Sequence, residues 1–149
     1  MASVAQLIKN QIKVKVQSCN SVQEVHTAPD INPKGWPAVF IVLSKMDGAF
    51  SSNTENSRIY SYILQCLFPL GQDMAPENLT TPDRLEYAEN VLETVIDDII
   101  NAVDDNFVLE GTPVLFVEAS SVEWGYTDIE TGVARVANIT LSVYTEITI

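Results

Sequence analysis

The chain has 149 residues, of which 46% are hydrophobic and 19% charged, and its formal net charge is −12. This length predicts one domain spanning residues 1–149, with too much apolar content for a disordered protein. The sequence excludes a membrane-spanning helix, because no apolar run approaches about 18 residues. It also argues against tight binding of nucleic acid through basic side chains, because acids outnumber Lys and Arg.

The N-terminal sequence lacks the apolar stretch and cleavage site of a signal peptide, so we expect synthesis in the cytoplasm. Charge is unevenly distributed along the chain. Residues 1–45 hold five Lys against two acids, a net of +3, and residues 46–149 hold three Arg against eighteen acids, a net of −15. Two such segments offer complementary surfaces to a partner or to another copy of the chain.

The residue types of common catalytic and metal sites are sparse. Cys19 and Cys66 belong to no CxxC pair, so we expect two separately buried, reduced thiols. A zinc site would need both of them, His26 and a carboxylate to converge. No serine lies in a glycine elbow, and no glycine-rich phosphate loop is present. The sequence therefore predicts no enzyme, no metal and no cofactor.

The chain begins with a predicted amphipathic helix. Val4, Leu7, Ile8 and Ile12 recur at helical spacing and Ser3 is placed to cap it. The alternating sequence "IKVKVQ" (12–17) leaves the end of this helix open. "SVQEVHT" (21–27) is a short strand candidate, and "APDINPKGWP" (28–37) is a loop.

Two strands are predicted next, "AVFIVLS" (38–44) and "RIYSYILQCLF" (58–68). The polar segment 45–57 between them contains an Asp-Gly turn signal, so we expect an antiparallel hairpin with a long loop. Loops longer than chain closure requires are usually functional or disordered.

The strongest periodic signal is a helix over 82–105, about 36 Å long, with Thr81 as its cap and Pro82 in its first position. Its apolar stripe consists of Leu85, Ala88, Val91, Leu92, Val95, Ile96, Ile99, Ile100 and Val103.

The helix is also rich in carboxylates, which a metal cluster, an acid/base pair or a solvated face would explain. Glu86, Glu89, Glu93, Asp97 and Asp104 fall opposite the stripe. Asp97 and Asp98 are neighbours in sequence and point about 100° apart, so they do not converge. We expect a solvent- or lumen-facing acidic surface formed by Glu93, Asp97, Asp98 and Asp104.

The last two strands are predicted at 112–124 and 133–149, joined by "GYTDIETG" (125–132). The final strand alternates cleanly, with Arg135 and Thr145 interrupting its apolar face. Seventeen extended residues span roughly 57 Å, so this hairpin should project beyond the body or be bent by a bulge. Trp124 and Tyr126 fall near its predicted tip, where large aromatics commonly anchor interfaces.

Together these elements predict an α+β fold. Its sheet is mainly antiparallel or mixed, has four to five strands, carries two helices on one face and ends in a projecting long hairpin. The opposite face of the sheet is partly apolar and has no helix of this chain to cover it. A second subunit is the simplest cover.

The order of these elements resembles the tail terminator (tail completion) proteins of long-tailed, lambda-like bacteriophages. The resemblance rests on the N-terminal helix, "GWPAVFIVL", the polar loop leading into "NSRIYSYILQCLF", the helix "TPDRLEYAENVLETVIDDIINAVDD" and the closing hairpin with "WGYTDIETGVARVANITLSVYTEI".

The resemblance implies a structural virion protein at the head-proximal end of the tail, assembled in the host cytoplasm. It implies a homohexameric ring that caps the tail tube, ends tube polymerisation and offers a surface to the head-tail connector or stopper protein. DNA would pass through an electronegative bore as cargo. We expect the contacts to involve Lys45, Asp47, Phe50, Asn53, Glu55, Arg58, Trp124, Tyr126, Asp128 and Arg135.

Two other functions stay open at this point. A head-side neck or stopper adaptor would share the architecture. A small acidic α+β ligand-binding or regulatory module would use the same helices and sheet, with a pocket at the sheet edge.

Overall fold

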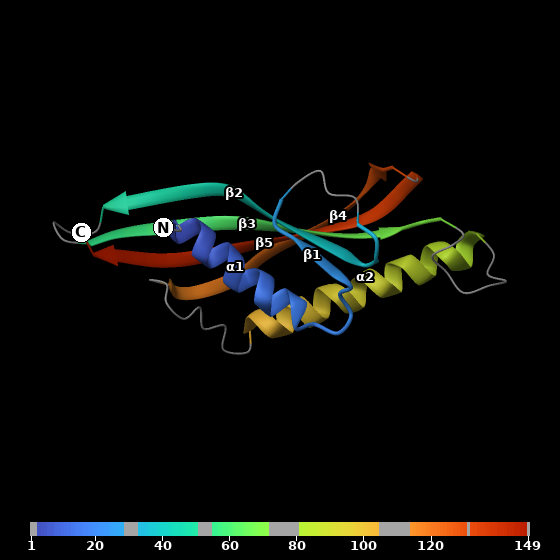
Figure 1. The fold of residues 1–149 in the computed structure, drawn as a ribbon, viewed down its shortest axis with the longest axis horizontal. Coiled ribbons are helices and arrows are strands. Elements are labelled where there is room, and N and C mark those ends of the chain that lie inside the picture. Colours follow the sequence, from blue (N-terminus) through green and yellow to red (C-terminus); the bar gives the residue numbers. More distant parts are fainter. Residues whose placement is uncertain are drawn as a thin grey trace.

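The computed structural model describes residues 3–28, 33–50, 55–71, 81–104, 114–130 and 132–148. Two helices lie on one face of a five-stranded sheet (Figure 1), which confirms the predicted α+β class. In chain order the elements are α1 (Val4–Gln17), β1 (Glu24–His26), β2 (Ala38–Phe50), β3 (Glu55–Pro69), α2 (Thr81–Asp104), β4 (Val114–Ile129) and β5 (Gly132–Thr148).

The sheet is mixed, with the strand order β1-β2-β3-β5-β4. β1 runs parallel to β2, and all other neighbours are antiparallel. β5 lies between β3 and β4, so the last strand of the chain occupies an interior position. No helix within the described part of the chain is long and apolar enough to cross a membrane.

α1 begins as predicted and continues through the alternating sequence to Gln17. The Ser3 hydroxyl accepts a hydrogen bond from the backbone N–H of Gln6, and the Gln6 side chain accepts one from the backbone N–H of Ser3. Ile8, Ile12 and Val16 recur every four residues and are buried, so the apolar face favours helix over strand to the end of the segment.

β2 and β3 are longer than predicted, and the expected long loop at 45–57 is wrong. β2 extends to Phe50 and β3 starts at Glu55, where it already pairs with Thr148 of β5. The ladders of β2 with β3 and of β3 with β5 give the described part of this polar segment hydrogen-bonding partners that its own sequence does not reveal. Asn53 lies outside the described residues.

A β-bulge interrupts the pairing of β2 with β3 between Leu43 and Lys45, and the Ser44 hydroxyl donates to the carbonyl of Ser61 at 3.0 Å. In Figure 1 the far end of this hairpin extends beyond the start of α1.

The predicted tip of the last hairpin is also wrong. β4 continues through Trp124 and Tyr126 to Ile129, and β5 begins at Gly132, whose φ of 142° favours glycine. Bulges interrupt β4 between Val114 and Phe116 and between Ala119 and Ser121, and a bulge was one of the two outcomes expected for so long a hairpin.

The main core lies between the sheet and the helices. α2 begins at Thr81, one residue before the predicted start, so Thr81 is helical rather than the cap. Its stripe is buried at Leu92, Val95 and Ile99, and Leu85 is the exception because it is 45% exposed. The Tyr62 hydroxyl, buried beneath α1, donates to the carbonyl of Ala5 at 2.7 Å.

A second, smaller cluster covers one end of the opposite, helix-free face of the sheet. It consists of Ala38, Phe40, Leu67, Ala134 and Val136, with Trp36 and Ile129 packed against it. The chain therefore covers part of this face itself, through the loop before β2, and leaves the remainder without a helix.

Candidate functional site

The most elaborate side-chain arrangement lies around Arg135, at the end of the sheet where β4 turns into β5. Arg135 pairs in the sheet with Phe68 of β3 and Tyr126 of β4. Its Nε and Nη2 donate to the two carboxylate oxygens of Glu89 on α2, at 2.7 and 3.0 Å. Its Nη1 donates to the carbonyl of Gly125 at 3.0 Å. The arginine thus ties the helix layer to the sheet.

Two aromatic rings flank the same guanidinium. The Cζ atom of Arg135 lies 5.3 Å from the ring centroid of Trp124 and 4.6 Å from that of Tyr126, within cation–π range. The hydrogen bond to Glu89 is the main cause of the raised pKa of Arg135. Because its donors are engaged within the chain, Arg135 positions the two rings rather than offering its own charge to a ligand.

The rings present the accessible part of this arrangement. Tyr126 is 65% exposed and Trp124 is 39% exposed, and Val133 and Leu85 are exposed nearby on β5 and on α2, one helical turn from Glu89. We call Trp124, Tyr126, Val133 and Leu85 the aromatic end. Exposed Trp and Tyr held in fixed orientations are typical of protein-binding surfaces.

The structure separates the predicted interface residues into two groups. Trp124, Tyr126, Asp128 and Arg135 lie at the aromatic end. Lys45, Asp47 and Arg58 lie toward the other end of the sheet. Along β3, Arg58 pairs with Thr145, whereas Phe68, ten residues later, pairs with Arg135. Ten residues along β3 correspond to about 33 Å, so the two groups cannot form one contact site.

Within the second group, Lys45 and Asp47 form an exposed ion pair with an N–O distance of 3.4 Å. The Arg58 side chain is exposed, and its backbone carbonyl accepts a hydrogen bond from the buried hydroxyl of Thr145 at 3.0 Å. Phe50 and Glu55 lie at the facing ends of β2 and β3. These residues mark the β2–β3 end of the sheet.

The acids of α2 do not all belong to one surface. Glu93, Asp97 and Asp104 are exposed, as predicted. Asp98 is half-buried and accepts a hydrogen bond from the Ser21 hydroxyl at 2.5 Å, so it links α2 to the turn after α1. Glu89, expected on the solvated face, is held by Arg135. The described residues contain no group of three His, Cys, Asp or Glu side chains that could hold a metal ion.

One polar cluster could not be predicted from the sequence. Glu24 on β1 interacts with His26 Nε2 at 2.9 Å and accepts backbone N–H groups from Lys34 and Gly35. The hydrogen bond with His26 is the largest cause that lowers the pKa of Glu24. The spacing of ten residues between Glu24 and Lys34 gives no periodic signal. The cluster fixes the segment that brings Trp36 onto the helix-free face.

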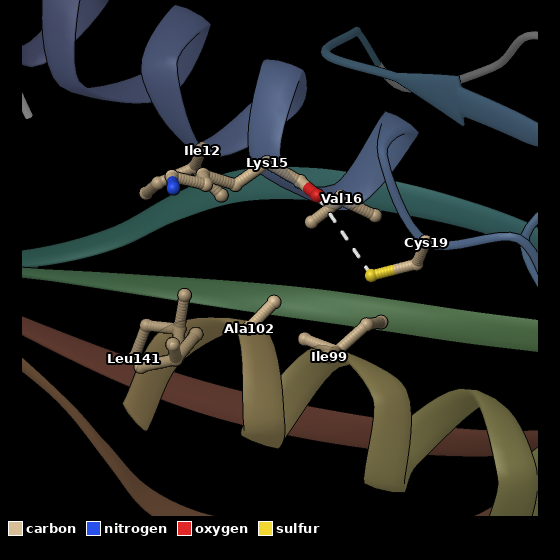
Figure 2. A pocket seen from close by; sticks show the side chains of 8 residues that line it. Ile12, Lys15, Val16, Cys19, Ile99, Ala102 and Leu141 are labelled. Atoms are coloured by element: carbon tan, nitrogen blue, oxygen red, sulfur yellow. Dashed lines mark hydrogen bonds between the residues drawn. The ribbon is translucent and has the colours of Figure 1, made fainter. Parts of the chain in front are cut away.

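One crevice among the described residues lies between α1 and α2 (Figure 2). It is lined by Ile12, Lys15, Val16, Cys19, Ile99, Ala102, Val103 and Leu141, and these side chains leave no space for a water molecule in it. The Cys19 thiol, whose pKa is raised by burial, donates to the carbonyl of Lys15 at 3.7 Å. Cys19 and Cys66 are both free and buried, as predicted. The crevice is packing between the helices.

No protein-family model and no curated protein sequence matches the chain. Among solved structures, a chain of one described as "Virion of native gene transfer agent (GTA) particle" aligns with 97% of this chain and 92% of its own length. The two are 13% identical in sequence, with a TM-score of 0.50. This comparison shows a shared fold.

Proposed function

We propose that the protein is a structural component of a phage-like virion. The observation that carries the proposal is the fold shared, over 97% of the chain, with a chain of a gene transfer agent particle. In its specific form, the protein caps the tail tube as a hexameric ring, stops polymerisation of the tube protein and presents a surface to the head-tail connector. It would then reside at the head-proximal end of the tail.

The two faces of the sheet support assembly with other protein chains. The helices cover one face, and the other exposes Val42 and the ring of Phe116, which stacks on Tyr144 with a centroid distance of 4.2 Å. The aromatic end adds a separate exposed apolar surface. Such surfaces on a small domain indicate contacts with partners.

The charge of the molecule suits a role in which DNA passes without being held. The exposed acids of α2, Glu93, Asp97 and Asp104, repel phosphate groups, whereas a basic surface would retain them. The proposal assigns no catalytic role and no cofactor to the protein.

The test combines sizing with electron microscopy. Light scattering should give a mass near six copies, and negative-stain images should show rings that cap tail tubes of the cognate phage when the two are mixed. Tubes assembled in its presence should be shorter than tubes assembled without it. A monomer at all concentrations, with no effect on the tubes, would overturn the proposal. Rings that bind connectors and ignore tubes would instead favour the head-side adaptor.

A further inference from the structure

The sheet has two long edges without a strand neighbour among the described residues. β1 pairs only with Ala38–Phe40, so β2 is unpaired on its outer side from Ile41 to Phe50. At the other side of the sheet, β4 is the terminal strand along its whole length. Both open edges exceed the typical strand length of about 5–6 residues.

Open edges of this length present rows of unpaired backbone N–H and C=O groups, which readily pair with another chain. Bulges lie in both strands and restrict where a regular ladder can form. Regular pairing geometry is available on β2 after its bulge, from Lys45 to Phe50, and on β4 between its two bulges, from Phe116 to Ala119. The two segments lie at the same level of the sheet, because Lys45 pairs with Ser61, which pairs with Ser142, the partner of Glu118.

The two edges differ in charge. All five lysines of the chain lie on α1, on β2 or in the loop before it, and α1 packs over β1 and β2. β4 exposes Glu118, Glu123 and Asp128, and the acidic helix α2 packs over β3, β5 and β4. The β2 side of both layers is therefore basic and the β4 side is acidic.

Strand directions allow these edges to meet in a ring. β2 and β4 run in opposite directions within the sheet, since β3 and β5 lie between them and each step is antiparallel. Rotation of a copy about an axis roughly along the strands preserves their directions. The β4 of that copy then meets β2 antiparallel, and the sheet continues from one subunit to the next.

We propose that the outer edge of β2, at Lys45–Phe50, pairs with the outer edge of β4 in a second copy of this chain, at Phe116–Ala119. The contact is head-to-tail, so each subunit uses a different edge on each side and repetition closes a ring. This inference rests on the proposed ring and names the surface that builds it. Two-fold pairing of β4 with itself is disfavoured because it brings carboxylates together.

Cysteine cross-linking tests the contact. Lys45, Phe116, Glu118 and Ser121 all face the helix-free side, judged from their register, whereas Val117 faces the helices. Lys45→Cys protein is mixed with Phe116→Cys, Glu118→Cys or Ser121→Cys protein and oxidised mildly. One of these mixtures should give a disulfide-linked dimer, because side chains opposite each other on one face come within bonding distance.

The controls separate the modes of pairing. Lys45→Cys alone should give no dimer, and neither should its mixture with Val117→Cys. The wild type should also stay uncross-linked, because Cys19 and Cys66 are buried. A chain that carries both Lys45→Cys and the reactive β4 cysteine should give a ladder of linked species up to the ring. Efficient dimerisation of Lys45→Cys alone would indicate a two-fold contact and overturn the inference.

The outcomes for the ring and for its function are distinguishable. Rings that cap tubes but give no cross-link with any β4 cysteine overturn the edge contact and leave the proposed function standing. Cross-linked rings that ignore tail tubes support the edge contact and remove the capping function. A protein that stays monomeric in sizing and gives no cross-link overturns both.

Discussion

Arg135 on β5 and Glu89 on α2 form a two-pronged ion pair, with N–O distances of 2.7 and 3.0 Å, that fastens the helix layer to the sheet. The Arg135 side chain is mostly buried, so removal of the Glu89 carboxylate would leave the guanidinium charge unpaired and poorly solvated. The pair thus contributes to stability as well as to the orientation of the rings.

We expect Glu89→Gln to lower the free energy of unfolding by about 1 kcal/mol and Arg135→Lys by about 1–2 kcal/mol, since lysine cannot reproduce the planar two-pronged contact. Urea unfolding followed by circular dichroism measures both. Glu93→Gln, on the exposed side of the same helix, is the matched control and should change stability by less than about 0.5 kcal/mol. Equal effects at Glu89 and Glu93 would contradict the assignment.

The stripe of α2 gives a second prediction. Ile99 is almost completely buried in the core, so Ile99→Ala should cost about 2–5 kcal/mol. Leu85→Ala, at the exposed start of the same stripe, should cost less than about 0.5 kcal/mol in the isolated chain. A loss below about 1 kcal/mol for Ile99→Ala in denaturant unfolding would mean that α2 is not packed as described.

A third prediction concerns acid pH. The hydrogen bond with His26, aided by the N–H groups of Lys34 and Gly35, lowers the pKa of Glu24 below its ordinary value of 4.5. A carboxyl group whose pKa is lower in the folded than in the unfolded state stabilises the fold at pH values above its unfolded-state pKa. This stabilisation is lost as the pH falls through the folded-state pKa.

Unfolding of the wild type should therefore become easier as the pH drops below the ordinary value of 4.5. Glu24→Gln should show a smaller loss over the same range, because it has no carboxylate to titrate. Thermal melts at a series of pH values, with Glu123→Gln as an exposed control, test this. Parallel curves for the wild type and Glu24→Gln would refute the role of Glu24.

The acids of α2 lead to a fourth prediction. Asp97→Asn should leave stability unchanged, whereas Asp98→Asn weakens the hydrogen bond from Ser21 and should cost about 1 kcal/mol. Neither change should remove a bound metal. Elemental analysis that finds stoichiometric metal in the wild type and its loss in Asp98→Asn would contradict this.

The aromatic end yields the last prediction. Trp124→Ala and Tyr126→Ala remove exposed rings from a strand that is already fully paired with β5, so the far-UV spectrum and cooperative unfolding should persist. Contact with a partner should weaken, visible as smaller species in sizing or as overlong tubes in assembly mixtures. Val14→Ala, at an exposed apolar position on α1, is the control and should affect neither. Normal rings and normal tube capping in both aromatic variants would exclude these rings from the interface.

The elements with one buried face were predictable from the sequence. The stripe of α2, the capped start of α1 and the alternation of β5 each reflect burial on one side, and the structure places them as expected. The buried hydroxyl of Thr145 explains one break in that alternation, because it bonds to the carbonyl of Arg58.

The ends of the long strands were not predictable. Gly48 and Gly125 indicated turns, yet both lie inside strands, and a Cβ at Gly48 would meet nothing within 4 Å. Segments exposed on both faces carry no burial pattern, so their pairing is set by the partner strand alone. The contact between Glu89 and Arg135 is equally hidden, since it depends on how α2 lies across the sheet.

The place of β5 between β3 and β4 has a consequence for how the chain folds. β3 pairs with a strand far downstream, from Pro69 with Ala134 to Glu55 with Thr148, so the interior ladder closes only after α2 and β4 have been made. Such non-local pairing carries a large loop-closure cost and slows folding. During synthesis on the ribosome, one edge of β3 would therefore stay unpaired until β5 emerges and completes the sheet in a late step.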